Sequence, residues 1–183
     1  MTSTSIIALD GDATPLIDPS ALIAPGTRII GDVRIGADAS IWYNCVLRGD
    51  VNFISVGART NIQDGTVVHC DSPFGGDPGY PTLIGDDCLI GHMAMIHGCT
   101  LEDHAFVGLG AIVLNGTRIE SDGMLAAGAM LTSGKVIRSG ELWAGRPAKF
   151  MRHLTPDEIA HNRGGVEHYV DNARRHIAAL KAR

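Results

Sequence analysis

Aliphatic residues recur at every sixth position along most of the chain, and this pattern defines its architecture. The members of the repeat are Ile17, Ile23, Ile29, Ile35, Ile41, Leu47, Val56, Ile62, Val68, Ile84, Ile90, Ile96, Val107, Val113, Ile119, Leu125, Leu131, Ile137 and Trp143. A period of six fits neither an α-helix nor a single alternating strand, but it is the repeat of a hexapeptide solenoid. Three hexads form one coil of a triangular prism, with the aliphatic side chains pointing inward and stacking from coil to coil.

The period slips at three places, where we expect local departures from the coil. The spacing lengthens to nine before Val56 and to eleven before Val107, and a small bulge would absorb each. It lengthens to sixteen before Ile84, where the intervening residues are rich in Pro and Gly. We therefore predict a solenoid over residues 12–150 with an excursion loop over about 70–81.

The last part of the chain changes from the period of six to a helical pattern. Thr155-Pro156-Asp157-Glu158 is a capping box with proline at the first helical position. We predict a helical segment over 155–183, interrupted at 162–165, that packs on the solenoid through one apolar stripe. The stripe consists of Val166, Val170, Ala173, Ile177 and Leu180. The predicted fold is an all-β solenoid, a parallel β-helix of hexapeptide repeats, with a C-terminal α-helix.

Composition narrows the class of protein. Hydrophobic residues make up 45% of the chain and aromatic residues only 5%, which predicts a core of aliphatic layers. A net charge of −5 without a run of Lys and Arg argues against nucleic-acid binding. The first ten residues lack the features of a signal peptide, and no apolar stretch approaches a membrane span. We expect a soluble, cytoplasmic protein that does not bind membranes.

The four cysteines do not suggest a zinc site. They fall at no CxxC spacing, so we expect reduced thiols in or near the core. They are Cys45, Cys70, Cys88 and Cys99.

Two histidines occupy equivalent positions in successive coils. His69 and His97 each follow an inward aliphatic residue, and they lie one coil apart once the ten extra loop residues are removed. Paired strands are about 4.8 Å apart, so the two imidazoles should point outward together and could share one metal ion. Ordinary surface or interface histidines are the alternative interpretation.

A third histidine lies too far away to join them within one chain. His92 precedes His97 by five residues, which places it roughly 16 Å away around a corner of the prism. Threefold packing of parallel prisms would bring it against the neighbouring subunit's His69 and His97, so a single three-histidine site predicts a homotrimer. Three imidazoles with an open fourth position are typical of catalytic zinc, although imidazole also suits iron, cobalt, nickel and copper.

Several motifs together resemble the γ-class carbonic anhydrase family. The resemblance covers about residues 12 to 150. Its motifs are Val46-Leu47-Arg48-Gly49-Asp50, Thr60-Asn61-Ile62-Gln63-Asp64, Val68-His69, Ile90-Gly91-His92, Ile96-His97-Gly98-Cys99 and Gly145-Arg146-Pro147-Ala148-Lys149. It implies a left-handed β-helix homotrimer with zinc, or iron, at each subunit interface; cobalt is a further possible metal because imidazole suits it. The implied metal ligands are His69 and His97 of one subunit and His92 of the next.

The resemblance also implies roles for five further residues. Arg48 and Asp50 would form an intersubunit ion pair beside the metal, or alternatively a salt bridge that only assembles the trimer. Gln63 would orient the metal-bound water, Asn61 would support it, and Tyr169 of the C-terminal helix would reach toward the metal.

The sequence departs from the family pattern in its acidic residues. Val51 stands where the founding archaeal enzyme has a glutamate, and Cys70-Asp71-Ser72 replaces a glutamate-bearing loop. Loss of these carboxylates removes the expected proton shuttle. Asp71 or Asp77 could replace them, or both could be ordinary solvated loop residues.

The leading functional hypothesis is reversible hydration of carbon dioxide to bicarbonate by a metal-bound hydroxide at trimer interfaces. Three alternatives stay open. The same metal chemistry could hydrolyse a thioester, as proposed for bacterial paralogues of this family. A hexapeptide acyltransferase would share the repeat without needing a three-histidine site, and a non-catalytic trimeric scaffold would need no turnover.

Overall fold

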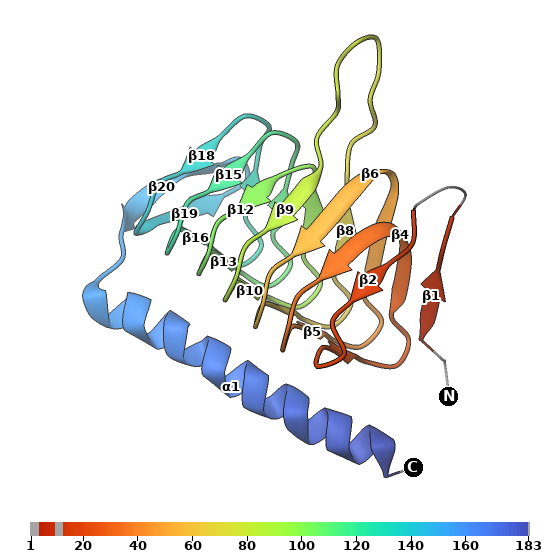
Figure 1. The fold of residues 1–183 in the computed structure, drawn as a ribbon. Helices are drawn as coiled ribbons and strands as arrows, with labels where there is room; N and C mark the ends of the chain where they lie inside the picture. Colours follow the sequence, from red (N-terminus) through yellow and green to blue (C-terminus); the bar gives the residue numbers. More distant parts are fainter. Residues whose placement is uncertain (1–3, 10–12, 183) are drawn as a thin grey trace.

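A computed structural model of the chain describes residues 4–9 and 13–182. These residues form a parallel β-solenoid of about seven turns, and the helix α1 (Pro156–Lys181) lies along it (Figure 1). The aliphatic residues of the period of six are largely buried inside the coils, Ile29, Ile62 and Ile96 among them at 0% exposure. The hexapeptide solenoid predicted from the sequence is confirmed.

Strands of successive coils stack into three rows, named A, B and C here. Row A contains β1 (Ser5–Ile7), the first part of β4 (Arg28–Ile35) and of β6 (Val46–Val56), β8 (Val67–His69), β11 (Met95–His97), β14 (Ile112–Val113) and β17 (Met130–Leu131). Row B contains β2 (Leu16–Ile17), the last part of β4 and β6, β9 (Thr82–Ile84), β12 (Thr100–Leu101), β15 (Arg118–Ile119) and β18 (Val136–Ile137). Row C contains β3 (Leu22–Ile23), β5 (Ser40–Ile41), β7 (Asn61–Ile62), β10 (Leu89–Ile90), β13 (Phe106–Val107), β16 (Met124–Leu125) and β19 (Glu141–Gly145).

The long strands β4 and β6 cross from row A to row B. Their register shifts between Gly31 and Val33, so β6 carries a bulge just after Gly49, as predicted for the spacing of nine. At Gly31, where φ is +77°, an added Cβ would lie 2.2 Å from the carbonyl oxygen of Gly49, so only glycine fits there. The bulge begins at Asp50, a predicted site residue.

The spacing of eleven has a different cause from the predicted bulge. Leu101 on β12 is 1% exposed and pairs with Ile84, so it is an inward residue of the repeat. The hexad after Ile96 is therefore one residue short. Gly98, at φ +54°, turns the chain immediately after His97, and this turn makes the shorter hexad possible.

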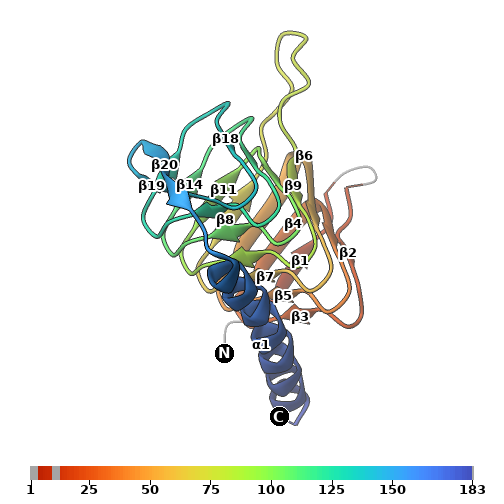
Figure 2. The same cartoon turned by 90° about the vertical axis from the view of Figure 1, so that its left-hand side faces the viewer.

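The chain leaves the stacked coils between β8 and β9. This segment, residues 70–81, projects away from the solenoid in both views (Figures 1 and 2). Phe74 near its tip is 86% exposed, and the amide and carbonyl groups of Phe74 and Asp77 hydrogen-bond to each other.

The two ends of the solenoid differ from the sequence prediction. β1 pairs with β4 before the predicted start, and β20 (Ala148–His153) folds back antiparallel on β19 at the other end. Periodicity cannot reveal either strand, because neither continues the repeat of six. The predicted limits at residues 12 and 183 lie outside the described residues.

The helix α1 is continuous, so the interruption predicted at 162–165 is wrong. Thr155 caps it through the predicted capping box. An added Cβ at Gly165 would lie 3.2 Å from Leu89, which shows how closely the helix approaches row C. This packing outweighs the roughly 1 kcal/mol that a helical glycine costs.

The apolar side of α1 covers row C. Val166 and Val170 pack against Leu89, and Ala173 packs with Trp42. A hydrogen bond of 2.8 Å also joins Tyr43 to His176. The wall that α1 builds over row C lies beside His92.

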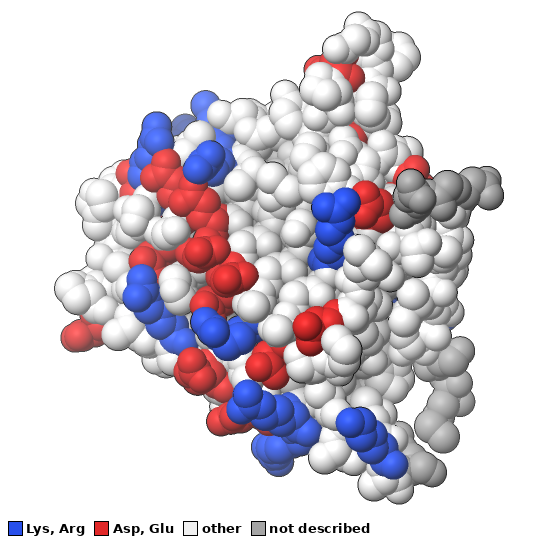
Figure 3. All heavy atoms as spheres, viewed as in Figure 1, with Lys and Arg blue, Asp and Glu red and all other residues white. Residues whose placement is uncertain are grey.

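Ionic side chains of row B pair from coil to coil. Arg118 donates to Glu102 at 2.6 Å, and Arg138 donates to Glu120 at 2.6 Å. Figure 3 shows acidic and basic side chains lying next to one another on this face. Such exposed pairs contribute little stability, and here they neutralise one another's charge.

The four cysteines are free and buried. Burial raises the pKa of Cys45, Cys88 and Cys99 to about 12, and it also raises that of Cys70. Thiols in this state are protonated at neutral pH and unreactive, which suits the core role predicted for them. In the part of the chain that the structure describes, no helix has the length and apolarity that crossing a bilayer requires.

Candidate metal centre

His69 and His97 lie side by side on row A. They are paired residues of β8 and β11, as the spacing predicted. Nδ1 of His69 lies 3.0 Å from Nε2 of His97, and the ring centroids are 5.0 Å apart. Both imidazoles are partly buried, so their orientation is set by the surrounding strands.

The outer nitrogen of His69 is held by Asp50. Nε2 of His69 lies 2.9 Å from Oδ1 of Asp50, and Arg48 donates to Oδ2 at 2.5 Å. Partial burial alone would raise the pKa of Asp50, but the hydrogen bonds from His69 and Arg48 outweigh it and lower that pKa. Arg48 and Asp50 thus form an ion pair within one chain, so the intersubunit pairing implied by the resemblance would have to replace or extend it.

The outer nitrogen of His97 is held by Asn115. Nδ1 of His97 lies 2.5 Å from Oδ1 of Asn115, which extends from the next coil. Sequence reasoning missed Asn115, because only the shortened hexad after Ile96 brings it beside His97. Arg48, Asp50, His69, His97 and Asn115 are called the strand half-site below.

The hydrogen bonds of the strand half-site fix which ring nitrogens carry protons. The carboxylate of Asp50 and the carbonyl oxygen of Asn115 can only accept, so Nε2 of His69 and Nδ1 of His97 must donate. The two remaining nitrogens, Nδ1 of His69 and Nε2 of His97, face each other across 3.0 Å, so when both rings are neutral their lone pairs point toward the same space. A cation satisfies both, and imidazoles with their outer N–H groups bound to oxygen are typical of metal ligands. The residues present fit a metal ion.

His92 lies at a corner after β10, away from row A. Its Nδ1 is 2.8 Å from Oδ2 of Asp64, so Nε2 is the nitrogen left for a metal, and the side chain is 41% exposed. Three apolar side chains in this part of the fold are exposed: Met93, the next residue in the chain, at 75%, Met95 at 43% and Leu109, which lines the same cavity, at 53%.

Gln63 and Tyr169 share a cavity with His92. The cavity has a volume of about 320 Å³ and lies between row C and α1, with Leu89 and Phe106 among its apolar lining residues. Gln63, His92, Tyr169, Asn61 and Asp64 are called the helix half-site below.

Asn61 orients the amide of Gln63. Nε2 of Gln63 donates to Oδ1 of Asn61 at 3.0 Å, and Asn61 donates to the carbonyl oxygen of Cys88 at 3.3 Å. Among the described residues, these two hydrogen bonds leave Oε1 and one N–H of Gln63 available to bond a molecule in the cavity. The role of Asn61 in supporting the metal-bound water, which the resemblance implies, stays a prediction.

Tyr169 is held against the ring of Trp42, edge to face, with centroids 5.6 Å apart. Burial and then the negative charge of Asp64 raise its pKa. The phenol is therefore protonated at neutral pH and can donate a hydrogen bond into the cavity.

The loop aspartates Asp71 and Asp77 make local contacts within the excursion loop. Asp77 accepts a hydrogen bond from the amide of Gly79 at 2.9 Å, which is a local turn contact. The main chain of Asp71 pairs with Tyr80 at the base of the loop. Val51, where the resemblance places a glutamate, is 41% exposed.

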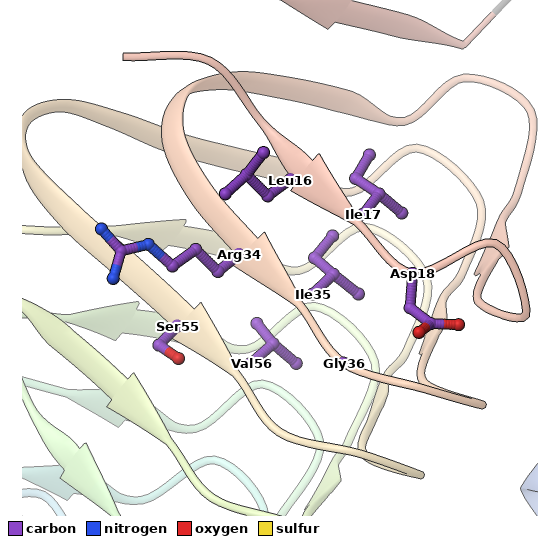
Figure 4. A pocket seen from close by; sticks show the side chains of 8 residues that line it. All are labelled: Leu16, Ile17, Asp18, Arg34, Ile35, Gly36, Ser55 and Val56. Carbon is purple, nitrogen blue, oxygen red and sulfur yellow. The ribbon is translucent and has the colours of Figure 1, made fainter. Parts of the chain in front are cut away.

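One chain does not assemble the three histidines. Within residues 4–9 and 13–182, no group of three or more His, Cys, Asp or Glu side chains could hold an ion. The strand half-site holds two of the predicted ligands and the helix half-site the third. A larger cavity of about 480 Å³ lies over the first coils of row B, lined by Leu16, Arg34 and Ser55, and contains none of these residues (Figure 4).

Comparison with known proteins decides the family. A model of the hexapeptide repeat of succinyl-transferase matches residues 81–105 and 98–133. The probable carbonic anhydrase of Methanocaldococcus jannaschii is 44% identical over 155 residues, which cover 85% of this chain and 94% of that protein. The chain belongs to the γ-class carbonic anhydrase-like hexapeptide-repeat family.

A curated relative and a solved structure show higher sequence identity. Gamma carbonic anhydrase 2, mitochondrial, of Arabidopsis thaliana is 51% identical over 91% of this chain, and the chain spans only 60% of that relative's length. The crystal structure of a hexapeptide transferase family protein from Anaplasma phagocytophilum superposes with a TM-score of 0.85 at 49% identity, covering 93% of this chain and 96% of that one.

Proposed function

We propose that this chain forms a homotrimer that catalyses the reversible hydration of carbon dioxide to bicarbonate at metal centres between subunits. In each centre His69 and His97 of one subunit and His92 of the next would hold the ion. Zinc is the proposed metal, with iron or cobalt as alternatives, because imidazole suits all three. The cytoplasmic location expected from the sequence stays a prediction.

The observation that carries the proposal is the pair of facing nitrogens in the strand half-site. Two imidazoles with lone pairs 3.0 Å apart supply two ligands of a cation, and a three-histidine centre needs one more. His92 has one nitrogen fixed by Asp64 and the other free, but it lies on a different side of the prism. Rotation by a threefold axis is the simplest way to join the two half-sites.

The surroundings of His92 support a subunit contact there. Met93, Met95 and Leu109 are exposed apolar side chains; Met93 follows His92 in the chain, and Leu109 lines the same cavity as His92. Exposed apolar groups of this kind usually mark an interaction surface. Met93 has a φ of +58°, a backbone conformation that usually favours glycine or asparagine. A bulky apolar side chain therefore stands at a corner where a smaller residue is usual.

Each half-site would have its own task in the reaction. When bound, the ion would supply the Lewis acidity that makes hydroxide available from water near neutral pH. Asp50 and Arg48 hold His69 in its ligating orientation. Gln63, oriented by Asn61, would hydrogen-bond the carbon dioxide or bicarbonate oxygen in the cavity, and the apolar wall beneath α1 would exclude bulk water.

A subunit-mixing experiment tests the shared centre. His92→Ala keeps the strand half-site, and His97→Ala keeps the helix half-site. Co-expression with two different affinity tags yields trimers that contain both variants. In any such ring only one interface joins an intact strand half-site to an intact helix half-site, so we expect about one zinc ion per mixed trimer. Each variant alone should hold almost none.

Carbon dioxide hydration is then measured on the same samples by stopped flow. Mixed trimers should regain about a third of the wild-type rate per subunit. Mixed trimers without zinc, or a monomer by light scattering, would overturn the shared centre. Full zinc loading of the wild type without hydration would overturn the reaction and leave the centre standing.

The apolar lining of the cavity favours thioester hydrolysis as a second candidate. Its lining includes Leu89 and Phe106, an apolar surface that a short acyl chain could contact and that a three-atom substrate does not need. Release of free thiol from short acyl thioesters by the zinc-loaded trimer, measured beside hydration, distinguishes the two reactions.

A further inference from the structure

The proposed centre leaves one partly buried polar contact without an assigned role. Asn115 follows β14, in the coil after His97, and its side-chain oxygen lies 2.5 Å from Nδ1 of His97. It belongs to none of the motifs that carry the family resemblance. Its surroundings show that the fold makes room for it in two independent ways.

The first is that the hexad containing His97, in the preceding coil, is one residue shorter than the hexad containing Asn115. In the coil of Asn115, two residues separate the inward Val113 from the positive-φ corner at Gly116. In the coil of His97, only His97 itself separates Ile96 from the corner at Gly98. Asn115 therefore has no counterpart directly beneath it, and its side chain extends into that space.

The second is the absence of a side chain at Gly98. A Cβ built on Gly98 would lie 2.8 Å from Oδ1 of Asn115, closer than real Cβ atoms approach an oxygen. Tyr80, from the base of the excursion loop, closes the same space, since its Cβ would lie 3.0 Å from that atom. Only a residue without Cβ admits both neighbours.

We propose that Asn115 is a positioning residue of the metal centre, which holds His97 with its proton on Nδ1 and so directs Nε2 at the metal. The inference rests on the proposed centre but not on the reaction catalysed there. Asp50 holds His69 in the same way, by accepting a hydrogen bond from its Nε2, so a different residue orients each of the two histidines. Asn115 would act through His97 and would not itself be a metal ligand.

Three variants test this role. Asn115→Leu keeps the approximate size but removes the acceptor, and Asn115→Asp keeps an acceptor oxygen. Ser133→Leu is the matched control, because Ser133 holds the equivalent place one coil further on, just before the corner at Gly134. Thermal unfolding of each metal-free trimer checks that the solenoid is intact.

Zinc affinity is measured by competition with a chelator. We expect Asn115→Leu to bind zinc about 10 to 100 times more weakly than the wild type, the usual effect of losing such a partner. Asn115→Asp should restore the affinity, and Ser133→Leu should leave it unchanged.

A spectroscopic readout separates positioning from general destabilisation. In zinc-loaded protein labelled with ¹⁵N-histidine, the Nδ1 proton of His97 should be protected from exchange in the wild type and in Asn115→Asp. It should be lost to exchange with water in Asn115→Leu. Unchanged zinc affinity in Asn115→Leu, or a protected proton in that variant, would overturn the role. Absence of zinc from the wild type would instead overturn the centre itself.

Discussion

The two half-sites are built in opposite ways. In the strand half-site, neighbouring coils of one row hold the histidines, and each outer nitrogen bonds a side chain from a preceding or following coil. In the helix half-site, His92 stands at an exposed corner, with one contact to Asp64, beside a cavity walled by α1. The regular repeat sets the two histidines of the strand half-site, and departures from the repeat set their partners Asp50 and Asn115. The helix half-site depends on the packing of α1 over row C.

This difference has a physical reason. A solenoid places equivalent residues of adjacent coils about 4.8 Å apart, which suits two ligands of one ion but cannot enclose it. Water exclusion and a substrate cavity need a second layer, which α1 supplies within the chain. In the proposed trimer, the rigid pair of ligands would meet the more exposed third ligand of another subunit.

The largest effect should come from the ligands themselves. His97→Ala and His92→Ala should each abolish stoichiometric zinc binding, measured by elemental analysis of purified trimers. Their metal-free stabilities should differ. His92→Ala should stay within about 0.5 kcal/mol of the wild type in urea unfolding, whereas His97→Ala should cost about 1 to 2 kcal/mol, because it breaks partly buried hydrogen bonds. Unfolding of His92→Ala would contradict the distinction.

Replacing Asp50, which holds His69, should weaken zinc binding more than replacing Asp64, which holds His92. Asp50→Asn should weaken zinc binding about 10 to 100 times, since Asp50 is fixed by both His69 and Arg48. Asp64→Asn should weaken it by about tenfold or less, because the Asp64 and His92 side chains are 42% and 41% exposed. Chelator competition measures both, and equal losses would show that the half-sites are equally rigid.

Gln63 should affect rate rather than metal binding. Gln63→Leu removes the amide that Asn61 orients toward the cavity, so hydration should fall about tenfold while zinc content is unchanged. Stopped-flow hydration and elemental analysis on one sample check this. Parallel loss of zinc and rate would place Gln63 among the groups that hold the metal.

The smallest effect concerns the start of α1, the wall of the helix half-site. Hydrogen bonds from Arg152 and then from the backbone of Thr155 lower the pKa of Glu158 to about 2. A lowered carboxyl pKa adds stability above the unfolded value of about 4.3, and this is lost as the pH falls toward 2. Glu158→Gln should therefore melt below the wild type at pH 7, with the gap closing between about pH 4 and pH 2.

The difference in melting temperature between Glu158→Gln and the wild type is measured on metal-free protein across that pH range. Arg152→Gln removes the same pair and should reproduce the pH dependence. A gap that stays constant from pH 7 to pH 2 would assign the effect to helix propensity instead of charge.

Much of the strand half-site could be predicted from the sequence. The period of six places His69 and His97 in register, because a regular repeat turns sequence separation directly into position. The contact of Asn115 with His97 could not be predicted, because it depends on a hexad that is one residue short. A strict period of six does not identify Leu101 as the inward residue that ends this hexad. The continuity of the helix through Gly164 and Gly165 could not be predicted either, because packing on Leu89 outweighs the low helix propensity of glycine.

The sequence by itself determined the solenoid, the family and the three histidines, since each depends on residue type at a fixed spacing. Only the tertiary structure decided which nitrogens carry protons, which residues hold them, and that Gln63, His92 and Tyr169 line one cavity. These features depend on side chains from different coils and from α1, whose distances no local pattern of residues encodes.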